Sequence, residues 1–319
     1  MTNKLISIVV PAYNEQEVIT HFHERLAAVM NEMANYRWEV VYVNDGSKDD
    51  TLKILHGLRD ADEHVAVLNL SRNFGKEIAL TAGLDHSSGD AIVVIDADLQ
   101  DPPELIPTLV ERWEEGADVA YAKRKKRDGE SAFKKATAHI FYRFMAKIGD
   151  VVLPEDTGDF RLLNRKALDA LNSVRERHRF MKGLFAWIGF HQVAVEYDRD
   201  PRFAGVTKWN YWKLWNLALE GFTSFTTMPL KLATYIGVLT AFGSFVYGLY
   251  MIITTLINGN DVAGYPSLVV IVLFLGGIQL MSIGVIGEYL GRIFNETKKR
   301  PLYFTNEWVP SRENITISE

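Results

Sequence analysis

Two long stretches without a charged side chain dominate the C-terminal part of the sequence. Residues 232–257 form a run of 26 residues without Asp, Glu, Lys or Arg, and residues 265–287 form a second run of 23. About 20 apolar residues in a helix suffice to cross the hydrocarbon core of a bilayer. Buried helices of a soluble domain are the alternative, but two such runs occur together behind an ordinary polar sequence. We therefore predict two membrane-spanning helices, at about 232–257 and 265–290.

The charges around the two runs predict their orientation. The connection between the runs carries only an acid. The outer ends of the pair are flanked by basic residues, namely Lys231, Arg292, Lys298, Lys299 and Arg300. By the positive-inside rule both chain ends then lie in the cytoplasm. The N-terminal residues lack the pattern of a signal peptide, so we expect a multi-pass protein of the inner (plasma) membrane with its bulk in the cytoplasm.

Small and aromatic residues add two expectations. Glycines 277, 284, 287 and 291 give the second run a small-residue stripe, which suits close packing with the first span or between subunits. Residues 208–230 mix tryptophans and lysines, as in helices that lie in the headgroup layer. We predict four parts: a cytoplasmic domain at 1–207, interfacial helices at 208–230, a two-helix membrane domain at 231–291 and a cytoplasmic tail at 292–319.

The first 125 residues alternate between short apolar runs and longer segments of helical periodicity. We predict strands at residues 6–10, 39–43, 65–70, 91–95 and 118–122. This alternation is typical of an α/β fold with a mostly parallel sheet and helices on both faces. Ligands of such folds bind outside the carboxyl ends of the strands. The residues that follow each strand are therefore the candidates for function.

Polar side chains follow all five predicted strands. In chain order they are Asn14 and Glu15; Asn44, Asp45 and Ser47; Arg72, Asn73 and Lys76; Asp96 and Asp98; and Lys123 and Arg124. Acids, bases and amides on one rim fit a charged ligand that carries both phosphate and a metal ion.

The stretch DADLQDPPE at 96–104 is the most acidic of these strand ends. In extended backbone, Asp96 and Asp98 point to the same face and hold two negative charges close together. A solvated turn is the alternative, but such a pair also suits Mg²⁺ or Mn²⁺, the hard cations that accompany phosphate. Asp101, followed by a proline and by Glu104, has the spacing of a helix N-cap, which indicates a structural role.

Several function classes are excluded or disfavoured. The net charge of −5 argues against general nucleic-acid binding, and the absence of cysteine excludes disulfides and thiolate chemistry. The first strand does not end in a GxGxxG turn and no GxxxxGK[ST] occurs, so the usual dinucleotide and P-loop fingerprints are missing. The histidines lack the spacing of zinc ligands.

Six motifs precede the two uncharged runs in a fixed order: VVPAYNE, VNDGSKDDT, RNFGKEIALTAGLDHSSGD, DADLQDPPE, GDFRLLNR and RFMKGLFAW. With them the chain resembles the family 2 glycosyltransferases of the GT-A fold, and most closely the membrane-anchored polyisoprenyl-phosphate glycosyltransferases of the bactoprenol glucosyltransferase type. DGSxDxT and DxD are shared widely, whereas RNFGKE, GDFRL and FMKG with paired spans are narrower. The resemblance reaches to about Trp308. It implies a GT-A-type, Rossmann-like sheet followed by interfacial helices and two transmembrane helices.

The resemblance also implies site residues. The nucleotide-sugar site comprises Pro11, Tyr13, Glu15, Asp45, Lys76, Asp96 and Gln100. Asp96 and Asp98 match the pair that binds Mg²⁺ or Mn²⁺, and Asp159 matches the position proposed as catalytic base, with Asp98 as the second catalytic residue. By the resemblance, the acceptor phosphate is expected at Arg202 and Lys208. Cations must also line the approach of one phosphate to another, so Arg124 and Arg127 are the next candidates, with a solvated surface loop as the alternative for this run.

The implied reaction moves a hexose, with inversion, from a nucleotide sugar to the phosphate of a membrane polyprenol. The resemblance favours UDP-glucose as donor and undecaprenyl phosphate as acceptor, and a homo-oligomer through the spans. GDP-mannose or a UDP-linked aminopentose stay open as donors, and a non-catalytic transporter is disfavoured because two short spans offer no substrate cavity. A phosphate monoester loses its second proton near pH 6. We therefore expect Asp159 to position the acceptor or basic side chains more than to remove a proton.

Overall fold

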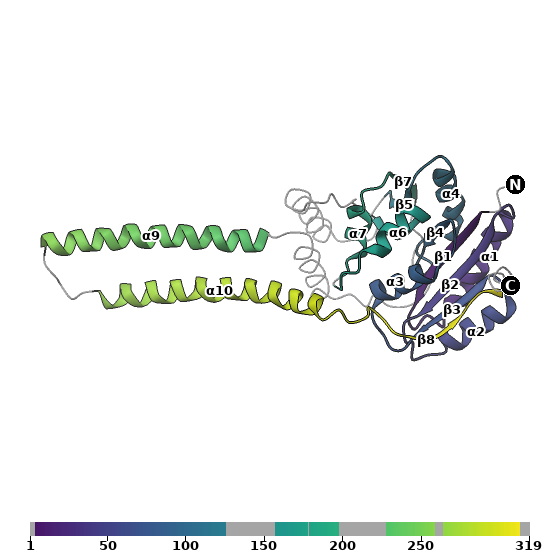
Figure 1. The fold of residues 1–319 in the computed structure, drawn as a ribbon, viewed down its shortest axis with the longest axis horizontal. Coiled ribbons are helices and arrows are strands. Elements are labelled where there is room, and N and C mark those ends of the chain that lie inside the picture. Colours follow the sequence, from purple (N-terminus) through teal and green to yellow (C-terminus); the bar gives the residue numbers. More distant parts are fainter. Residues whose placement is uncertain (1–3, 126–156, 178, 198–227, 259–263, 313–319) are drawn as a thin grey trace.

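A mixed sheet forms the body of the N-terminal domain (Figure 1). The computed structural model describes residues 4–125, 157–177, 179–197, 228–258 and 264–312. Its strands are β1 (Leu5–Ala12), β2 (Arg37–Asn44), β3 (Val65–Leu70), β4 (Ala91–Val94), β5 (Val119–Arg124), β6 (Thr157–Asn164), β7 (Gln192–Tyr197) and β8 (Thr305–Val309). They lie in the order β7-β5-β6-β4-β1-β2-β3-β8.

The five strands predicted from the sequence are confirmed, as is the α/β class with helices on both faces. β1 pairs in parallel with β2 and β4, β2 with β3, and β5 with β7. The sheet is more mixed than predicted, because β6 and β8 run antiparallel to their neighbours. Neither of these strands was foreseen.

Helices cover both faces of the sheet. Besides the 3₁₀ turn η1 (Pro103–Leu105), the domain contains α1 (Ile19–Glu32), α2 (Thr51–Ala61), α3 (Lys76–His86), α4 (Ile106–Glu114), α6 (Arg165–Ser173) and α7 (Met181–Trp187). Side chains from α1, α2 and α4 join one buried cluster, and side chains from α3, α6 and α7 join the other. Each cluster fills one face, which gives the three-layer arrangement of an α/β domain.

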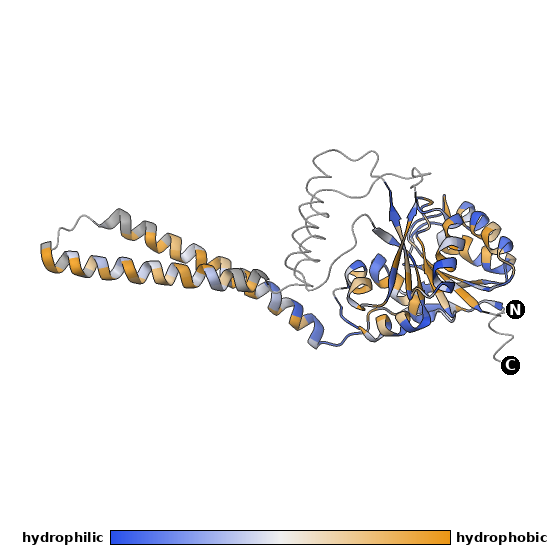
Figure 2. Cartoon of the chain, turned by 90° about the horizontal axis from the view of Figure 1, so that it is seen from above, coloured by the Kyte–Doolittle hydropathy of each residue, from blue (hydrophilic) through white to orange (hydrophobic). Residues whose placement is uncertain are grey.

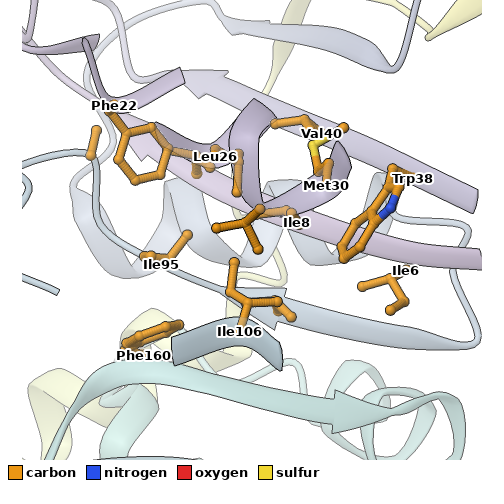
Figure 3. Close-up of a cluster of buried hydrophobic side chains, with 14 of the residues drawn as sticks. Ile6, Ile8, Phe22, Leu26, Met30, Trp38, Val40, Ile95, Ile106 and Phe160 are labelled. Atoms are coloured by element: carbon orange, nitrogen blue, oxygen red, sulfur yellow. The ribbon is translucent and has the colours of Figure 1, made fainter. Parts of the chain in front are cut away.

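The alternation of side chains along the strands divides the core. In β1, Ile6 and Ile8 point into the cluster under α1, whereas Val9 points into the cluster under α3. Figure 3 shows the first cluster, in which Phe22, Leu26 and Met30 of α1 lie over the sheet. These strands are buried on both faces, so their sequences read as continuous apolar runs.

The close approach of α3 to the sheet depends on Gly83. A Cβ atom added at this position would lie 2.8 Å from Cγ2 of Val43, closer than real side chains allow. The absence of a side chain therefore lets α3 lie directly on β1 and β2. This matters for the site, because α3 begins at the rim where the strands end.

Two long helices extend from the sheet domain, α9 (Met228–Asn258) and α10 (Tyr265–Thr297), and they lie side by side (Figure 1). Within them, Ala233–Met251 and Phe274–Thr297 are long and apolar enough to cross a membrane. Figure 2 shows that both helices are apolar over most of their length, with hydrophilic residues where α10 nears the sheet domain. The second stretch includes Glu288, which lies beyond the uncharged run and pairs with Arg292 at 3.2 Å.

The segment after α10 returns to the sheet, where β8 pairs antiparallel with β3. Side-chain bonds support this connection: Glu296 Oε1 accepts a hydrogen bond from the Arg177 amide at 2.7 Å, and the Tyr303 hydroxyl bonds to Asp85 at 3.0 Å. The stretch expected to form only a tail therefore contributes an edge strand to the catalytic domain.

Candidate active site

The carboxyl ends of six strands meet at one rim of the sheet. They belong to β1, β2, β3, β4, β5 and β7, and the antiparallel strands β6 and β8 begin at the same rim. The chain runs from β1 to β2 and β3 on one side and then returns to β4 on the other side of β1. Such a reversal in strand order opens the crevice in which α/β sheets bind ligands. The loop after β4 lies directly at this point.

Three charged side chains meet next to the crevice. Nζ of Lys76 lies 2.6 Å from Oδ2 of Asp96 and 2.6 Å from Oδ2 of Asp159. Lys76 is the first residue of α3, Asp96 follows β4, and Asp159 lies near the start of β6. The register explains the meeting: Val94 pairs with Arg161 across β4 and β6, so continuing the antiparallel pairing by two residues sets Asp96 opposite Asp159.

The electrostatics of this cluster favour an ionised Asp159. Burial works to raise the pKa of the Asp159 carboxyl, but the ammonium of Lys76, with the charges of Lys182 and Arg161, outweighs burial and holds the pKa well below its ordinary range. Oδ1 of Asp159 is buried and has no hydrogen-bond partner among the residues that the structure describes. The carboxylate is therefore charged, only 8% exposed, and has one oxygen free to accept a donor or a cation.

Asp96 differs from Asp159 in its titration. Burial raises the pKa of Asp96; the Lys76 ammonium opposes this rise and the Asp159 charge adds to it. The two carboxyl groups compete for one ammonium, so their proton affinities are driven apart. Such a separation is typical of functional sites.

Glu77 is a charged residue of the site that the sequence did not single out. Its Oε2 accepts a hydrogen bond from the Met181 amide at 3.1 Å, which fixes the start of α7 beside α3. Burial and the Asp159 charge raise the pKa of Glu77 to about 7. Its position beside Lys76 in RNFGKE was the only signal available in the sequence.

Arg161 lies on β6 two residues beyond Asp159, and it is buried. Its guanidinium donates to the carbonyl of Gly158 at 2.9 Å and to that of Asp159 at 3.3 Å, and its Cζ lies 3.8 Å from the ring centre of Phe185. These two hydrogen bonds hold the backbone that carries Asp159. The described contacts join Arg161 to this backbone and include no direct ion pair with the Asp159 side chain.

Asp98 and Gln100 share the loop after β4 with Asp96. β4 ends at Val94, and the following residues form a turn in which Leu99 has a φ of 59°. The extended geometry assumed for Asp96 and Asp98 is therefore wrong, although both remain at the rim. The Gln100 amide donates to Oδ1 of Asp98 at 3.2 Å. Among the residues that the structure describes, no three His, Asp or Glu side chains form a metal cluster.

The N-cap assigned to Asp101 is wrong. Pro102 precedes η1, and no side chain caps this turn. Asp101 is instead 2% exposed, and its Oδ1 accepts a short hydrogen bond from the Tyr197 hydroxyl. Glu104 pairs with Arg25, at 2.6 Å. Local spacing resembled a cap, but a partner 96 residues away in sequence takes the carboxylate.

Asp45 lies on the other side of the crevice, after β2. Its carboxylate accepts hydrogen bonds from the Phe74 amide at 2.7 Å and from the Gly75 amide at 2.9 Å. Burial raises the pKa of Asp45, and these two amides oppose the rise. Gly46 has a φ of 64°, and a Cβ there would lie 2.6 Å from the backbone of Arg72, so only glycine fits. Asp45 thus holds the loop that leads to Lys76.

The remaining predicted residues divide into those at the rim and those outside the described structure. Pro11 pairs with Val43 at the end of β1, and Tyr13 and Glu15 follow in the next loop, where the Glu15 amide donates to Thr51 Oγ1 at 2.9 Å. Arg124 ends β5. Arg127, Arg202, Lys208 and residues 208–227 of the interfacial helices predicted at 208–230 lie outside the described residues, whereas residues 228–230 begin α9.

Comparisons with known proteins place the chain in a family. Residues 7–171 match the model of glycosyl transferase family 2, and residues 228–293 match the GtrB C-terminal hairpin. The chain is 51% identical over 298 residues to a bactoprenol glucosyl transferase of Shigella phage SfX, covering 93% of this chain and 97% of that protein. It is 51% identical over 302 residues to an uncharacterized glycosyltransferase of Synechocystis, covering 95% of both.

Solved structures give a weaker likeness. The chain is similar to glucosyl-3-phosphoglycerate synthase from Mycobacterium tuberculosis, solved with Mn²⁺, UDP and phosphoglyceric acid, with a TM-score of 0.46 and 20% identity over 67% of this chain and 75% of that chain. The resemblance inferred from the motifs is confirmed by the family models and by the relatives that match nearly the whole chain. The chain belongs to glycosyl transferase family 2, with the GtrB C-terminal hairpin, and is a glycosyltransferase.

Proposed function

We propose that the protein transfers a hexose, with inversion, from a nucleotide sugar to the phosphate of a membrane polyprenol. UDP-glucose is the favoured donor and undecaprenyl phosphate the favoured acceptor, since relatives named bactoprenol glucosyl transferase share 51% to 52% identity over 93% of the chain. The observation that carries the proposal is the charged cluster at the crevice, Lys76 between Asp96 and Asp159, in a chain that also carries an apolar helical hairpin.

The order of the strands separates the two substrates. Asp45 lies at the end of β2, Asp96 follows β4, and Arg124 ends β5 beyond β6. Neighbouring strands are roughly 4.8 Å apart, so β5 lies about 10 Å from β4 along the rim. We assign the base and ribose to the side of β1 and β2, the diphosphate to the centre, and the acceptor phosphate to the side of β5.

The carboxylates at the centre fit a divalent cation. Asp96 and Asp98 offer the hard oxygen donors that Mg²⁺ and Mn²⁺ prefer, and Mg²⁺ is usually held by one or two carboxylates together with substrate phosphates. Because no third carboxylate or histidine completes a cluster with them among the described residues, substrate phosphates would supply the remaining ligands. When bound there, the cation would stabilise the charge that develops on the leaving diphosphate.

Asp159 in this proposal orients groups more than it removes a proton. A carboxyl whose pKa is held far below neutrality is a weak base, and the acceptor phosphate is already mostly a dianion at pH 7. The charged Asp159 instead holds the Lys76 ammonium at 2.6 Å beside the leaving group. Lys76 then opposes the negative charge that the two substrates bring together.

The hairpin would keep the active site at the membrane surface. Extracting a polyprenyl tail costs roughly 0.8 kcal/mol per buried CH₂, so the enzyme has to meet its acceptor at the headgroups. We propose that α9 and α10 cross the inner membrane, with residues 208–230 in the interface and the catalytic domain and both ends in the cytoplasm. The proposed parts are then the catalytic domain up to residue 207, the interfacial segment up to 230, the membrane hairpin up to 291 and a final segment whose strand β8 joins the catalytic sheet.

The glycines of α10 support a homo-oligomer. Added Cβ atoms at Gly277, Gly284, Gly287 and Gly291 would meet nothing within 4 Å. Among the described residues, no atom of α9 therefore occupies the space beside these glycines. That space is open for close packing between subunits in the bilayer.

A transfer assay tests the proposal. The purified full-length chain is incubated with undecaprenyl phosphate, Mg²⁺ or Mn²⁺ and a panel of labelled UDP-glucose, GDP-mannose and UDP-aminopentose, with a chelator control. We expect labelled lipid from UDP-glucose, lost on chelation and in Asp96→Asn, and retained in Asp169→Asn, an exposed carboxylate on α6. Transfer that continues undiminished without metal would contradict the role of Asp96 and Asp98.

A further inference from the structure

Strands β5 and β7 end together at the acceptor side of the rim. They pair in parallel up to Arg124 and Tyr197, and the Lys125 amide donates to the Tyr197 carbonyl at 3.0 Å. From these two ends the chain continues into residues 126–156 and 198–227, which contain the other predicted acceptor residues, Arg127, Arg202 and Lys208. The last described residues of both strands are therefore the described residues that adjoin the predicted acceptor residues most directly in sequence.

A buried hydrogen-bonded chain connects these two strand ends to the loop after β4. The Tyr197 hydroxyl donates a short hydrogen bond to Oδ1 of Asp101, and Nε of Arg124 donates to the Tyr197 hydroxyl at 3.4 Å. Asp101 is 2% exposed and Tyr197 is 5% exposed. Burial and the Asp101 charge raise the pKa of Tyr197 to about 12, so the hydroxyl keeps its proton and remains a donor at neutral pH.

The position of Gly158 leaves room for this arrangement. A Cβ added there would lie 3.3 Å from Nη2 of Arg124 and 3.6 Å from Oδ2 of Asp101. The guanidinium and the buried carboxylate thus border the backbone just before Asp159. Burial works to lower the pKa of Arg124, but the Tyr197 hydroxyl and the charges of Asp101 and, least, Asp96 raise it, so the guanidinium stays charged beside the buried carboxylate.

A buried carboxylate beside an arginine can be purely structural, but two features favour a role in binding. Asp101 accepts from the tyrosine and not from the guanidinium in the contacts described, so the arginine keeps donors for another anion. A guanidinium is also suited to phosphate, because its planar fork matches two phosphate oxygens.

Resting on the proposed function, we propose that Asp101 and Tyr197 are positioning residues that hold the Arg124 guanidinium for the phosphate of the acceptor lipid. Asp101 fixes the hydroxyl of Tyr197, and the hydroxyl fixes Nε of Arg124. The remaining guanidinium N–H groups then face the acceptor side of the crevice, about two strand spacings from Asp96.

The test is a comparison of apparent KM values for the two substrates in the full-length enzyme. Tyr197→Phe keeps the ring that packs edge-on against Phe160 and removes only the hydroxyl. We expect the KM for undecaprenyl phosphate to rise roughly two- to tenfold, as for the loss of one hydrogen bond, with the KM for the nucleotide sugar and kcat unchanged. Asp101→Asn, which keeps an acceptor oxygen, should raise it less than Asp101→Ala.

The matched control is Tyr36→Phe. It removes a tyrosine to glutamate hydrogen bond of 3.3 Å, to Glu114, at an exposed site away from the rim, and both KM values should stay at the wild-type level. In a double-mutant cycle, Tyr197→Phe added to Arg124→Ala should cause no further rise, because the hydroxyl acts through the arginine.

Other results would overturn the inference. A rise confined to the KM of the nucleotide sugar would assign the arginine to the donor diphosphate, and an additive effect in the double variant would show that Tyr197 acts without Arg124. A fall in kcat with both KM values unchanged, and with a lowered melting temperature, would indicate a structural role alone. If the wild-type chain transfers no sugar to polyprenyl phosphate, the proposed function itself fails. That result differs from every outcome of the variant comparisons, because each of those requires an active wild type.

Discussion

Replacing Glu77 by glutamine should make the protein more stable at high pH while changing little at low pH. The folded protein raises the pKa of Glu77 from 4.5 to about 7 through burial and the Asp159 charge. A group whose pKa is higher in the folded state binds its proton more tightly there than in the unfolded chain. Its burial therefore costs nothing below pH 4.5, and the cost grows as the pH rises until the carboxyl ionises near pH 7 in the folded protein too.

The size of the effect follows from the two pKa values. One pKa unit corresponds to 1.36 kcal/mol, so the full cost above pH 7 is about 3 kcal/mol. At pH 5 the unfolded carboxyl is already largely ionised, which leaves roughly 2–3 kcal/mol to appear between pH 5 and pH 8. For a domain of this size that difference corresponds to about 5–10 °C in melting temperature. Glutamine keeps the oxygen that accepts from the Met181 amide, so the hydrogen bond survives.

The measurement is thermal unfolding of the full-length chain in detergent, followed by tryptophan fluorescence between pH 5 and pH 8. The quantity of interest is the melting temperature of Glu77→Gln minus that of the wild type, because groups that titrate equally in both proteins cancel. Glu111→Gln, an exposed residue of α4, is the matched control and should show no trend. A Glu77→Gln difference that stays constant across this pH range would refute the reasoning.

Three further predictions concern neighbouring contacts. Lys76→Met should lower the free energy of unfolding more at pH 8 than at pH 5, by about 1–3 kcal/mol at the higher pH, because Asp96 and Asp159 lose their shared ammonium, which is 45% exposed; a loss independent of pH in unfolding experiments would contradict this. Asp45→Ala should raise the KM for the nucleotide sugar and cost about 1–3 kcal/mol of stability, since the Phe74 and Gly75 amides lose their acceptor; thermal unfolding and donor titration check both effects. Tyr303→Phe should lower stability by about 1 kcal/mol and leave both KM values at the wild-type level, and a selective KM change would show that this contact reaches the site.

The strands that could be predicted from the sequence are those with mainly apolar, buried side chains. β1 to β4 are buried along nearly their whole length and β5 begins with the apolar VAYA, so the existence of these strands follows largely from hydrophobicity. β6 interrupts its apolar positions with Asp159 and Arg161, and β8 is a short edge strand of mixed polarity, TNEWV. Strand preference depends on what lies across the pair, and their partners β4 and β3 are distant in sequence.

The site shows the same division between local and distant information. The motifs named Lys76, Asp96 and Asp159, and the structure brings these three together at 2.6 Å. The cap assigned to Asp101 failed because spacing describes only the nearest neighbours, whereas the residue that binds its carboxylate, Tyr197, comes from the last strand before the membrane segments. Sequence motifs could identify residues that lie at the rim, but they could not predict which carboxylate pairs with which basic side chain or hydroxyl group.

The reversed direction of β6 accounts for the chemistry at the centre of the rim. A parallel strand would present its last residues there, after a run of apolar positions, whereas an antiparallel strand presents its first residues. Asp159 can therefore be the third residue of β6 and still lie opposite Asp96, with Arg161 directly behind it on the same strand to grip its backbone. Because the same strand also pairs with β5, Asp159 stands between the side of the nucleotide and the side of Arg124. A single buried strand thus fixes the distance between the group that would leave and the group that would attack, which is the positioning that a transfer between two bound substrates requires.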